Sequence, residues 1–269
     1  LYDLFLDKKH RQYSCAYFSS ENESLEDAQQ NKINHIIKKL NLKPEQKVLD
    51  IGCGWGGLSF EIARQSRCEV TGISLSENQI NYCNKKAKEL NLDNQVSFEI
   101  CDYRNVKGKF QKIVSVGAFE HFGKQFYKTF FKKVNKLMTD DGICLLHTIG
   151  SVDPPGPTQP FIQRHIFPGG IIPSLSDLIE PIEKTGLILA DCETLIHHYD
   201  KTLAIWLDRF LKNKERAKYL YNREFVRMWE FYLASCSAAF KFRDLVVYQL
   251  QLVKNFTAPP SNRRNYIYQ

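Results

Sequence analysis

The feature that most limits the fold of this chain is a regular alternation of β-branched and helical segments, which begins at residue 47. The segments expected to form strands are KVLDIG (47–52), CEVTGIS (68–74), QVSFEIC (95–101), KIVSVG (112–117) and GICLLHTIG (142–150). Between them lie helical segments at 58–66, 77–90 and 126–138. Strands that alternate with helices pair in parallel and carry helices on both faces. The alternation therefore predicts a doubly wound, mostly parallel α/β sheet.

The segments on either side of this alternation extend the prediction. A helix is expected over about 25–40, because its isoleucines and Leu40 share one face and Pro44 follows its end. Residues 151–173 contain six prolines and three glycines, which indicates a long connection or lid. After it we expect a helix at 172–186, a strand at 187–195 and aromatic-rich helices over about 201–254.

Length and composition are typical of one soluble globular domain. The 269 residues are 43% hydrophobic and 25% charged. No apolar run approaches the roughly 18 residues that a membrane span needs, and the N-terminal residues lack the apolar region of a signal peptide. These observations predict a cytoplasmic protein. The chain begins with Leu1, so an upstream region can be missing from it.

Cysteine spacing and charge narrow the classes of function. The eight cysteines include no C-x-x-C pair, which argues against a zinc site and against a disulfide scaffold, and no metal is expected. The whole net charge of +7 lies in residues 200–269, which carry 13 basic and 6 acidic side chains. Such a segment suits an anionic lipid surface, nucleic acid or solvent.

The sharpest local motif is VLDIGCGWGG at 48–57, an expected strand that ends in a glycine-rich turn and opens a helix. Glycines let a ligand approach the backbone, and the helix start leaves amides unpaired for it. The spacing of Gly52, Gly54 and Gly57 also satisfies the G-x-G-x-x-G pattern of dinucleotide sites. Asp50 favours S-adenosylmethionine instead, because a carboxylate repels a pyrophosphate but attracts the cationic methionine end of that ligand.

Polar residues after the next two expected strands fit the same ligand. Ser74 and Gln79 stand where a dinucleotide site usually has an acidic residue for the ribose, and they are expected to bind hydroxyl groups as neutral partners. Asp102 is placed to meet the exocyclic amine of adenine, although a turn or helix-capping role is nearly as well supported.

A titratable pair follows the apolar strand at 112–117, where VSVGAFEHFG places Glu120 beside His121. His147 falls near the end of the following expected strand. Ligands of open α/β sheets collect at the carboxyl ends of the strands, so Glu120 and His147 are expected to converge on the glycine turn.

Seven stretches of the sequence resemble the cyclopropane-fatty-acyl-phospholipid synthases and the mycolic acid cyclopropane synthases. These stretches are YSCAYF (13–18), VLDIGCGWGG (48–57), GISLSENQ (72–79), GAFEHFG (117–123), LLHTIG (145–150), IFPGGIIPS (166–174) and FYLASCSAAF (231–240). The resemblance implies a single domain over 1–269 with a seven-stranded sheet of the class I methyltransferase type. Its parts would be an N-terminal helical lid (1–46), a cofactor-binding core (47–150) and a substrate-side insertion with C-terminal helices that cover the lipid (151–269).

The resemblance also implies roles for individual residues. Those expected to contact S-adenosylmethionine are Tyr13, Ser14, Gly52, Gly54, Ser74, Gln79 and Gly117. A bicarbonate ion is expected beside the sulfonium, held by Cys15, Glu120, His147, Ile149 and Tyr232. Cys15 and Ile149 would act through their backbone amides, and Glu120 would accept the O–H of the ion. The implied reaction adds a methylene group to the cis double bond of an acyl chain through a carbocation that bicarbonate deprotonates.

The expected partner is an unsaturated phospholipid acyl chain, reached by peripheral association with the inner face of the membrane. The resemblance allows a homodimer, and nucleic acid is not expected. Other products remain open at this point: methyl-branched acyl chains, or methylated small-molecule amines. An NAD-dependent oxidoreductase is disfavoured by Asp50 and Ser74, and a non-catalytic lipid- or RNA-binding module would use only the basic C-terminal region.

Overall fold

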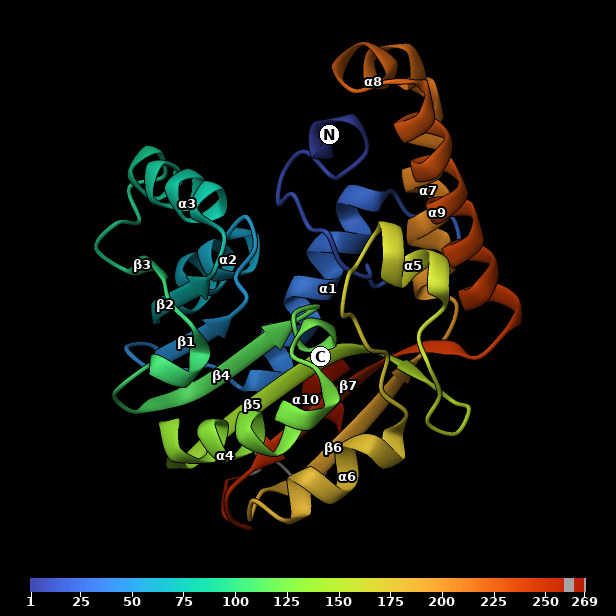
Figure 1. Cartoon of the computed structure of the whole chain (residues 1–269). Coiled ribbons are helices and arrows are strands. Elements are labelled where there is room, and N and C mark those ends of the chain that lie inside the picture. The colour runs from blue at the N-terminus through green and yellow to red at the C-terminus, as the bar shows by residue number, and fades with distance from the viewer. Residues whose placement is uncertain (259–263, 269) are drawn as a thin grey trace.

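The computed structural model describes residues 1–258 and 264–268, and its centre is one seven-stranded sheet (Figure 1). The strands are β1 (Lys47–Ile51), β2 (Glu69–Ser74), β3 (Val96–Ile100), β4 (Phe110–Val116), β5 (Met138–Ser151), β6 (Ile188–Leu195) and β7 (Leu245–Val253). Their order is β3-β2-β1-β4-β5-β7-β6. Strands β1 to β5 pair in parallel, and β7 runs antiparallel to both β5 and β6. The predicted doubly wound, mostly parallel sheet is confirmed.

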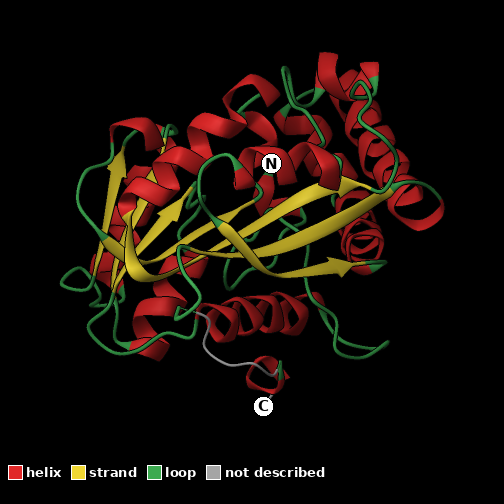
Figure 2. Cartoon of the chain, turned by 90° about the horizontal axis from the view of Figure 1, so that it is seen from below, coloured by secondary structure: helices red, strands yellow, loops and turns green. Residues whose placement is uncertain are grey.

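Helices cover both faces of this sheet (Figure 2). The α-helices are α1 (Leu25–Leu40), α2 (Gly57–Ser66), α3 (Glu77–Glu89), α4 (Tyr127–Leu137), α5 (Pro160–His165), α6 (Leu175–Glu183), α7 (His198–Lys212), α8 (Lys214–Leu220), α9 (Arg223–Phe242) and α10 (Asn265–Tyr268). Helices α1, α2 and α3 bury apolar side chains against one face, and α4 and α6 against the other. Short 3₁₀ helices include η2 (Tyr103–Asn105) and η3 (Phe119–His121).

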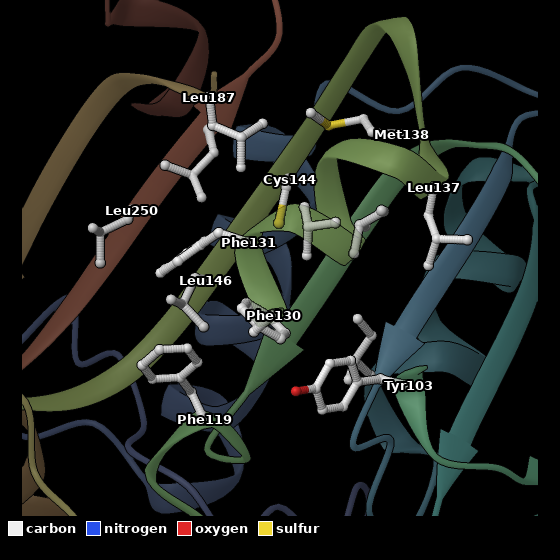
Figure 3. Packing of buried hydrophobic residues seen from close by; sticks show 14 of the residues in the cluster. Tyr103, Phe119, Phe130, Phe131, Leu137, Met138, Cys144, Leu146, Leu187 and Leu250 are labelled. Atoms are coloured by element: carbon white, nitrogen blue, oxygen red, sulfur yellow. The ribbon is translucent and has the colours of Figure 1, made fainter. Parts of the chain in front are cut away.

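The core beneath α4 fixes the position of the segment that follows β4. Phe119 of η3 is fully buried and contacts Phe130 and Phe131 of α4, with ring centroids 5.1 and 5.6 Å away. Figure 3 shows these rings packed with Leu146 and Cys144 of β5. Because Phe119 is anchored in this way, the next residue in the chain is held at the end of the sheet.

Helix α1 has the predicted bounds and is capped at both ends. The Ser24 hydroxyl accepts a hydrogen bond from the Asp27 amide at 3.1 Å, and Asn41 adopts the left-handed conformation that ends the helix. Ile33, Ile36 and Leu40 are fully buried, so the helix packs on the sheet as expected.

A third apolar cluster joins the N-terminal segment to α7 and α9, and α5 packs against it. Figure 1 shows these elements gathered on the side of the sheet toward which the β4 arrow points. Residues 151–173 form the long connection that was expected, with α5 inside it. The proposed division into 1–46, 47–150 and 151–269 stays a prediction, although β6 and β7 from the third part complete the one sheet.

The helices predicted over 201–254 were wrong at their C-terminal end. Helix α9 ends at Phe242, and residues Leu245–Val253 form β7, inserted between β5 and β6. The sequence LVVYQLQLV is buried along nearly its whole length. A strand that is covered on both faces has a continuous apolar run, which periodicity alone cannot distinguish from a buried helix.

Candidate active site

Two cavities adjoin at the carboxyl end of the parallel strands. The first, which we call the glycine-turn cavity, has a volume of about 570 Å³ and is lined by the turn after β1 and the ends of β2 and β4. The second, the apolar cavity, has a volume of about 780 Å³ and lies under residues 151–172 and the C-terminal half of α9. Five residues line both cavities and form their junction: Tyr13, Ser14, Gly117, His121 and Phe167.

The glycine turn after β1 is shaped for close approach of a ligand. Gly52 has φ of +82°, and a Cβ atom at this position would lie 2.5 Å from the Cβ of Ala118. Gly54 has φ of +55° with no atom within 4 Å of a Cβ position, so its backbone faces open space in the cavity. The positive φ of both residues favours glycine, and at Gly52 the close approach of Ala118 also excludes a side chain.

Asp50 lies at the base of this cavity. Its carboxylate accepts a hydrogen bond from the Ser59 hydroxyl at 2.7 Å and is only 2% exposed. Burial raises the pKa of Asp50 to about 6, against the opposing effects of Ser59 and the ammonium group of Lys32. A cationic ligand in the cavity would stabilise the ionised form further.

Ser74, Gln79 and Asp102 all line the glycine-turn cavity, but they are not equally available. The Ser74 hydroxyl donates to the Gln79 side-chain oxygen at 2.9 Å, so the two form a neutral pair at the end of β2. Asp102 caps η2 and binds the Arg104 guanidinium through two oxygens, at 2.9 and 2.6 Å. This ion pair lowers the pKa of Asp102. The capping role considered for Asp102 is thus present, and its predicted contact with adenine stays untested.

Glu120 is the most unusual group at the site. One carboxylate oxygen, Oε1, accepts a hydrogen bond from the Ile149 amide at 2.6 Å. The other, Oε2, is buried without a hydrogen-bond partner in the described part of the chain. Burial raises the pKa of Glu120, against the effect of the Ile149 amide. An unpartnered buried carboxylate oxygen is costly, so its position at a cavity wall fits a ligand that can donate a hydrogen bond to it.

His147 lies on β5 at the wall of the apolar cavity and is 2% exposed. Its Nδ1 accepts a hydrogen bond from the Gln249 side-chain amide of β7 at 3.1 Å. With the Gln249 amide in this orientation, its nitrogen donates to Nδ1 and the neutral ring carries its proton on Nε2. Burial lowers the pKa of His147 well below its ordinary value, and the charges of Lys32 and Lys39 add to this effect. The ring is therefore a neutral donor.

Tyr232 of α9 lies next to the junction of the two cavities, because it contacts the junction residue Tyr13. Its hydroxyl lies 2.9 Å from the hydroxyl of Tyr13, and both side chains line the apolar cavity. Burial raises the pKa of both phenols well above the ordinary value, so both stay neutral hydrogen-bonding groups. Tyr232, a predicted site residue far along the sequence, thus contacts Tyr13 in the N-terminal segment.

Cys15 also lines the apolar cavity, and its thiol is buried. The thiol donates to the Ala16 carbonyl at 3.2 Å, and burial raises its pKa. A thiol that stays protonated is a poor nucleophile. Cys15, Glu120, His147, Ile149 and Tyr232 all line the apolar cavity, and the Ile149 amide is bonded to Glu120.

The sequence reasoning missed several residues that support the site. Lys32 of α1 is fully buried and donates to the Ser14 hydroxyl at 2.9 Å and to the Gln12 side-chain oxygen. Arg11 lines the glycine-turn cavity, with its guanidinium 4.5 Å from the Trp55 ring centroid. Gln249 was missed because its strand was taken for a helix. Lys32 could have been found from sequence only through its place on the predicted buried face of the amphipathic helix α1, where a lysine is unexpected.

Large apolar side chains from the C-terminal part of the chain divide into two groups. Phe167, Ile171 and Phe240 line the apolar cavity. Trp206, Phe210 and Trp229 are instead packed in the third apolar cluster. Amphipathic helices bury aromatic residues for either purpose, so sequence alone could not separate the groups.

The basic side chains of α7 and α8, which belong to the basic segment 200–269, are mostly paired within the protein. Arg209 binds Glu26 through two hydrogen bonds at 3.0 and 2.7 Å. Lys212, Lys214 and Lys218 form ion pairs with Asp208, Glu230 and Glu215, respectively. No helix among the described residues is both long enough and apolar enough to cross a membrane.

The sheet order, the glycine turn and the cavity beside it define the fold of class I S-adenosylmethionine-dependent methyltransferases. Coclaurine N-methyltransferase, 21% identical with a TM-score of 0.82, shares this fold over 94% of this chain and 78% of its own. Residues 1–250 match the family described as mycolic acid cyclopropane synthetase, and the chain belongs to this family.

Among its relatives is the cyclopropane-fatty-acyl-phospholipid synthase of Escherichia coli K12, which is 38% identical over 239 residues. That alignment covers 89% of this chain and 61% of the relative, so the chain spans about three fifths of that protein's length. The cyclopropane synthase MmaA2 from Mycobacterium tuberculosis has a similar structure, with 32% identity and a TM-score of 0.88 over 93% of this chain and 92% of its own. Mycolic acid cyclopropane synthase CmaA1 in complex with SAH and CTAB gives the same values.

Proposed function

We propose that this chain forms cyclopropane fatty acids, by adding a methylene group from S-adenosylmethionine to the cis double bond of an unsaturated phospholipid acyl chain. The observation that carries this proposal is a buried oxygen of Glu120, beside the junction of the two cavities, that has no hydrogen-bond partner among residues 1–258 and 264–268. Family membership supports the reaction class, and the relative in Escherichia coli bears the corresponding name.

The glycine-turn cavity fits S-adenosylmethionine by the chemistry of its walls. Gly52 and Gly54 leave the backbone open to the ligand, and Asp50 supplies a negative charge for its cationic end. Ser74 and Gln79 offer hydroxyl and amide groups for the ribose, and Asp102 lies at the same wall. When bound, this cosubstrate supplies a methyl group on a positively charged sulfur. Tyr13, Ser14 and Gly117 at the junction would lie between it and the apolar cavity.

The wall formed by Glu120, His147 and Tyr232 fits a small anion that also carries an O–H group, and we propose that bicarbonate binds there. Glu120 Oε2 is free to accept the O–H, while His147 Nε2 and the Tyr232 hydroxyl are neutral donors. The amides of Cys15 and Ile149 would complete the set, and the second requires Glu120 to release the Ile149 amide. Bound bicarbonate supplies a proton acceptor for ring closure.

The protein's own contribution is to hold charge in place and to exclude water. A buried carboxylate that is engaged with an anion is kept from attacking a carbocation directly. Phe167, Ile171 and Phe240 make the substrate side of the junction apolar, which suits an acyl chain and lowers the local dielectric. The mainly apolar lining of this cavity favours an acyl chain over the small amine of the amine methyltransferase alternative.

Methyl-branched acyl chains are the second candidate product, because they arise from the same carbocation. A relative in Pseudomonas putida, 36% identical over 262 residues, is named a probable fatty acid methyltransferase. Retention of all five residue types expected at the bicarbonate site favours ring formation.

We further propose that the protein works in the cytoplasm, where it associates peripherally with the inner face of the membrane, and that it can form a homodimer. Nucleic acid has no part in this proposal. The support is the lipid substrate named for the relatives, together with an apolar cavity that is large enough to take part of an acyl chain.

The test is incubation with labelled S-adenosylmethionine and vesicles of unsaturated phospholipid, followed by mass spectrometry of the released fatty acids. A label retained in a ring-containing chain supports the proposal, whereas a labelled methyl branch points to the second candidate. Glu120→Gln and Tyr232→Phe are expected to lower turnover at least about a hundredfold while leaving cofactor affinity unchanged. Wild-type turnover in both variants would rule out the bicarbonate site.

A further inference from the structure

An apolar stripe runs along the exposed side of α9. Its members are Phe231, Ala234, Ala238 and Phe242, spaced by three or four residues and therefore on one face of the helix. Phe231 is 53% exposed and Phe242 is 76% exposed, which is unusual for phenylalanine in a helix whose other face is buried. Phe161 of α5 packs against Phe231 with ring centroids 4.7 Å apart, and Figure 1 shows α5 beside α9.

This stripe is continuous with the apolar cavity. Ala238 and Phe242 belong to the stripe and also line the cavity wall. Most of residues 153–159 also line this cavity and are exposed, and Val152 just before them is 59% exposed. The exposed apolar side chains thus surround one edge of the cavity in which the acyl chain would lie.

Positive charges stand at both ends of the stripe. Arg223 and Arg227 lie on the N-terminal part of α9, and Lys241 and Arg243 lie at its C-terminal end. None of the four forms an ion pair within the described residues, in contrast to Lys212, Lys214 and Lys218. Lys241 Nζ lies 5.3 Å from the centroid of the Phe242 ring. Exposed aromatic rings flanked by basic side chains are typical of surfaces that rest at the headgroup level of anionic membranes.

Acidic groups near the stripe are few. Asp244 accepts a hydrogen bond from the Ser151 hydroxyl at 2.9 Å, and Asp153 lies on the opposite rim. Glu224 is in the first turn of α9, three residues before Arg227. The net charge along this edge of the cavity is therefore positive.

We propose that the exposed stripe of α9 and the rim at 151–159 form the surface that docks on a bilayer containing anionic phospholipid. The inference rests on the proposed function, because it makes the docked face the entrance through which an acyl chain leaves the bilayer for the apolar cavity. It moves the membrane contact away from the basic segment of α7 and α8. Docking here removes the need for a whole lipid to leave the membrane before it reacts.

Helix α8 provides a matched control surface. Tyr219 is 89% exposed and Leu220 is 51% exposed, so this helix also presents apolar surface. Neither residue lines the apolar cavity, and the neighbouring Lys214 and Lys218 are ion-paired. Loss of an exposed aromatic ring from α8 therefore matches the chemical change on α9 without touching the proposed surface.

The experiment measures cosedimentation of the full chain with vesicles of phosphatidylethanolamine, with or without phosphatidylglycerol. Phe231→Ser is expected to weaken vesicle affinity about tenfold, because a buried phenylalanine side chain contributes about that much. The double variant Arg227→Gln/Lys241→Gln is expected to lose affinity for the anionic vesicles and not for the zwitterionic ones. Tyr219→Ser should bind as the wild type does. Turnover of detergent-dispersed lipid should be unchanged in every variant, since none of these residues lines the cavity.

The outcomes separate this inference from the proposed function. Vesicle binding that depends on Phe231 in a protein without turnover would support the docking surface and overturn the proposed function. Unchanged binding in Phe231→Ser, or an equal loss in Tyr219→Ser, would overturn the docking surface. So would conversion of a dimer to a monomer by Phe231→Ser in light scattering, because the stripe would then be a contact between two copies of the chain.

Discussion

At the scale of single residues, the site combines groups whose charge states are set by burial. Glu120 and Asp50 are buried carboxyls with raised pKa values, and His147 is a buried imidazole with a lowered one. Burial penalises the charged form in each case. A cationic cosubstrate would offset this penalty at the two carboxylates, which is a reason for the protein to keep such groups at a ligand site.

Lys32 gives a prediction about cofactor binding. Its ammonium group donates to Gln12 and Ser14, and Ser14 lies at the junction of the cavities. Lys32→Met is expected to weaken S-adenosylmethionine binding about tenfold, in line with the loss of hydrogen bonds from a charged donor. Calorimetric titration measures this change. Lys38→Met, the same substitution on a less buried turn of α1, is the control and should bind normally. Equal affinity in both variants would contradict the positioning role.

Asp50 gives a prediction about stability and pH. Its pKa rises from 3.8 to about 6 on folding, so the folded state binds the proton more tightly than the unfolded state. The stabilisation is complete below about pH 4 and is lost as the pH rises through about 6. Between about pH 4 and pH 6, the free energy of unfolding of the wild type should fall by up to about 3 kcal/mol relative to that of Asp50→Asn. Urea unfolding of both proteins across this range measures the difference, and a difference that does not vary with pH would refute it.

At the scale of elements, the antiparallel strand β7 completes the sheet and brings Gln249 opposite His147. The register pairs His147 with Gln249 and Gly150 with Val246. The ring of Tyr248 crosses β5 at Gly150, and its hydroxyl donates to the Ser151 carbonyl at 3.0 Å. The close approach of this ring leaves no room for a side chain at Gly150.

Gly150→Ala is therefore expected to destabilise the fold. An added Cβ would lie 2.1 Å from the Tyr248 ring, which forces the ring or the strand to move. We expect a loss of about 1–3 kcal/mol in the free energy of unfolding. Gly156→Ala is the control, because a Cβ there would meet only Pro154 O at 3.8 Å. Chemical denaturation of both variants is the measurement, and equal stability would show that the ring moves freely.

At the scale of the whole molecule, two cavities with different walls meet at a few shared residues. The glycine-turn cavity depends on β1, β2 and β4, whereas the apolar cavity depends on α9, β5 and the connection at 151–172. In the proposed reaction, S-adenosylmethionine and the acyl chain would thus be bound by different parts of the chain. A change that fills one cavity should leave binding in the other intact.

Ala239→Phe tests this separation. Ala239 lines the apolar cavity and lies outside the glycine-turn cavity, so a larger side chain would take space from the acyl chain only. Turnover on unsaturated lipid is expected to fall about tenfold or more, while calorimetric affinity for S-adenosylmethionine stays within about twofold of wild type. Loss of cofactor affinity would show that the cavities are not independent.

The sequence by itself determined the parallel part of the sheet, helix α1, the glycine turn and the family. These features depend on local patterns: strand and helix periodicity, capping residues and glycines that no other residue can replace. Glu120 and His147 were expected to converge on the glycine turn, because the ends of neighbouring parallel strands meet at one edge of a sheet. Both line the adjoining apolar cavity and not the glycine-turn cavity, and their roles stay a prediction.

Only the tertiary structure decided which groups become partners. It placed β7 between β5 and β6, set Gln249 against His147, and buried Lys32 against Gln12 and Ser14. It also divided the aromatic residues between cavity wall and core. The physical reason is that a sequence pattern records how far a side chain is buried, whereas its partner is fixed by long-range packing and strand register.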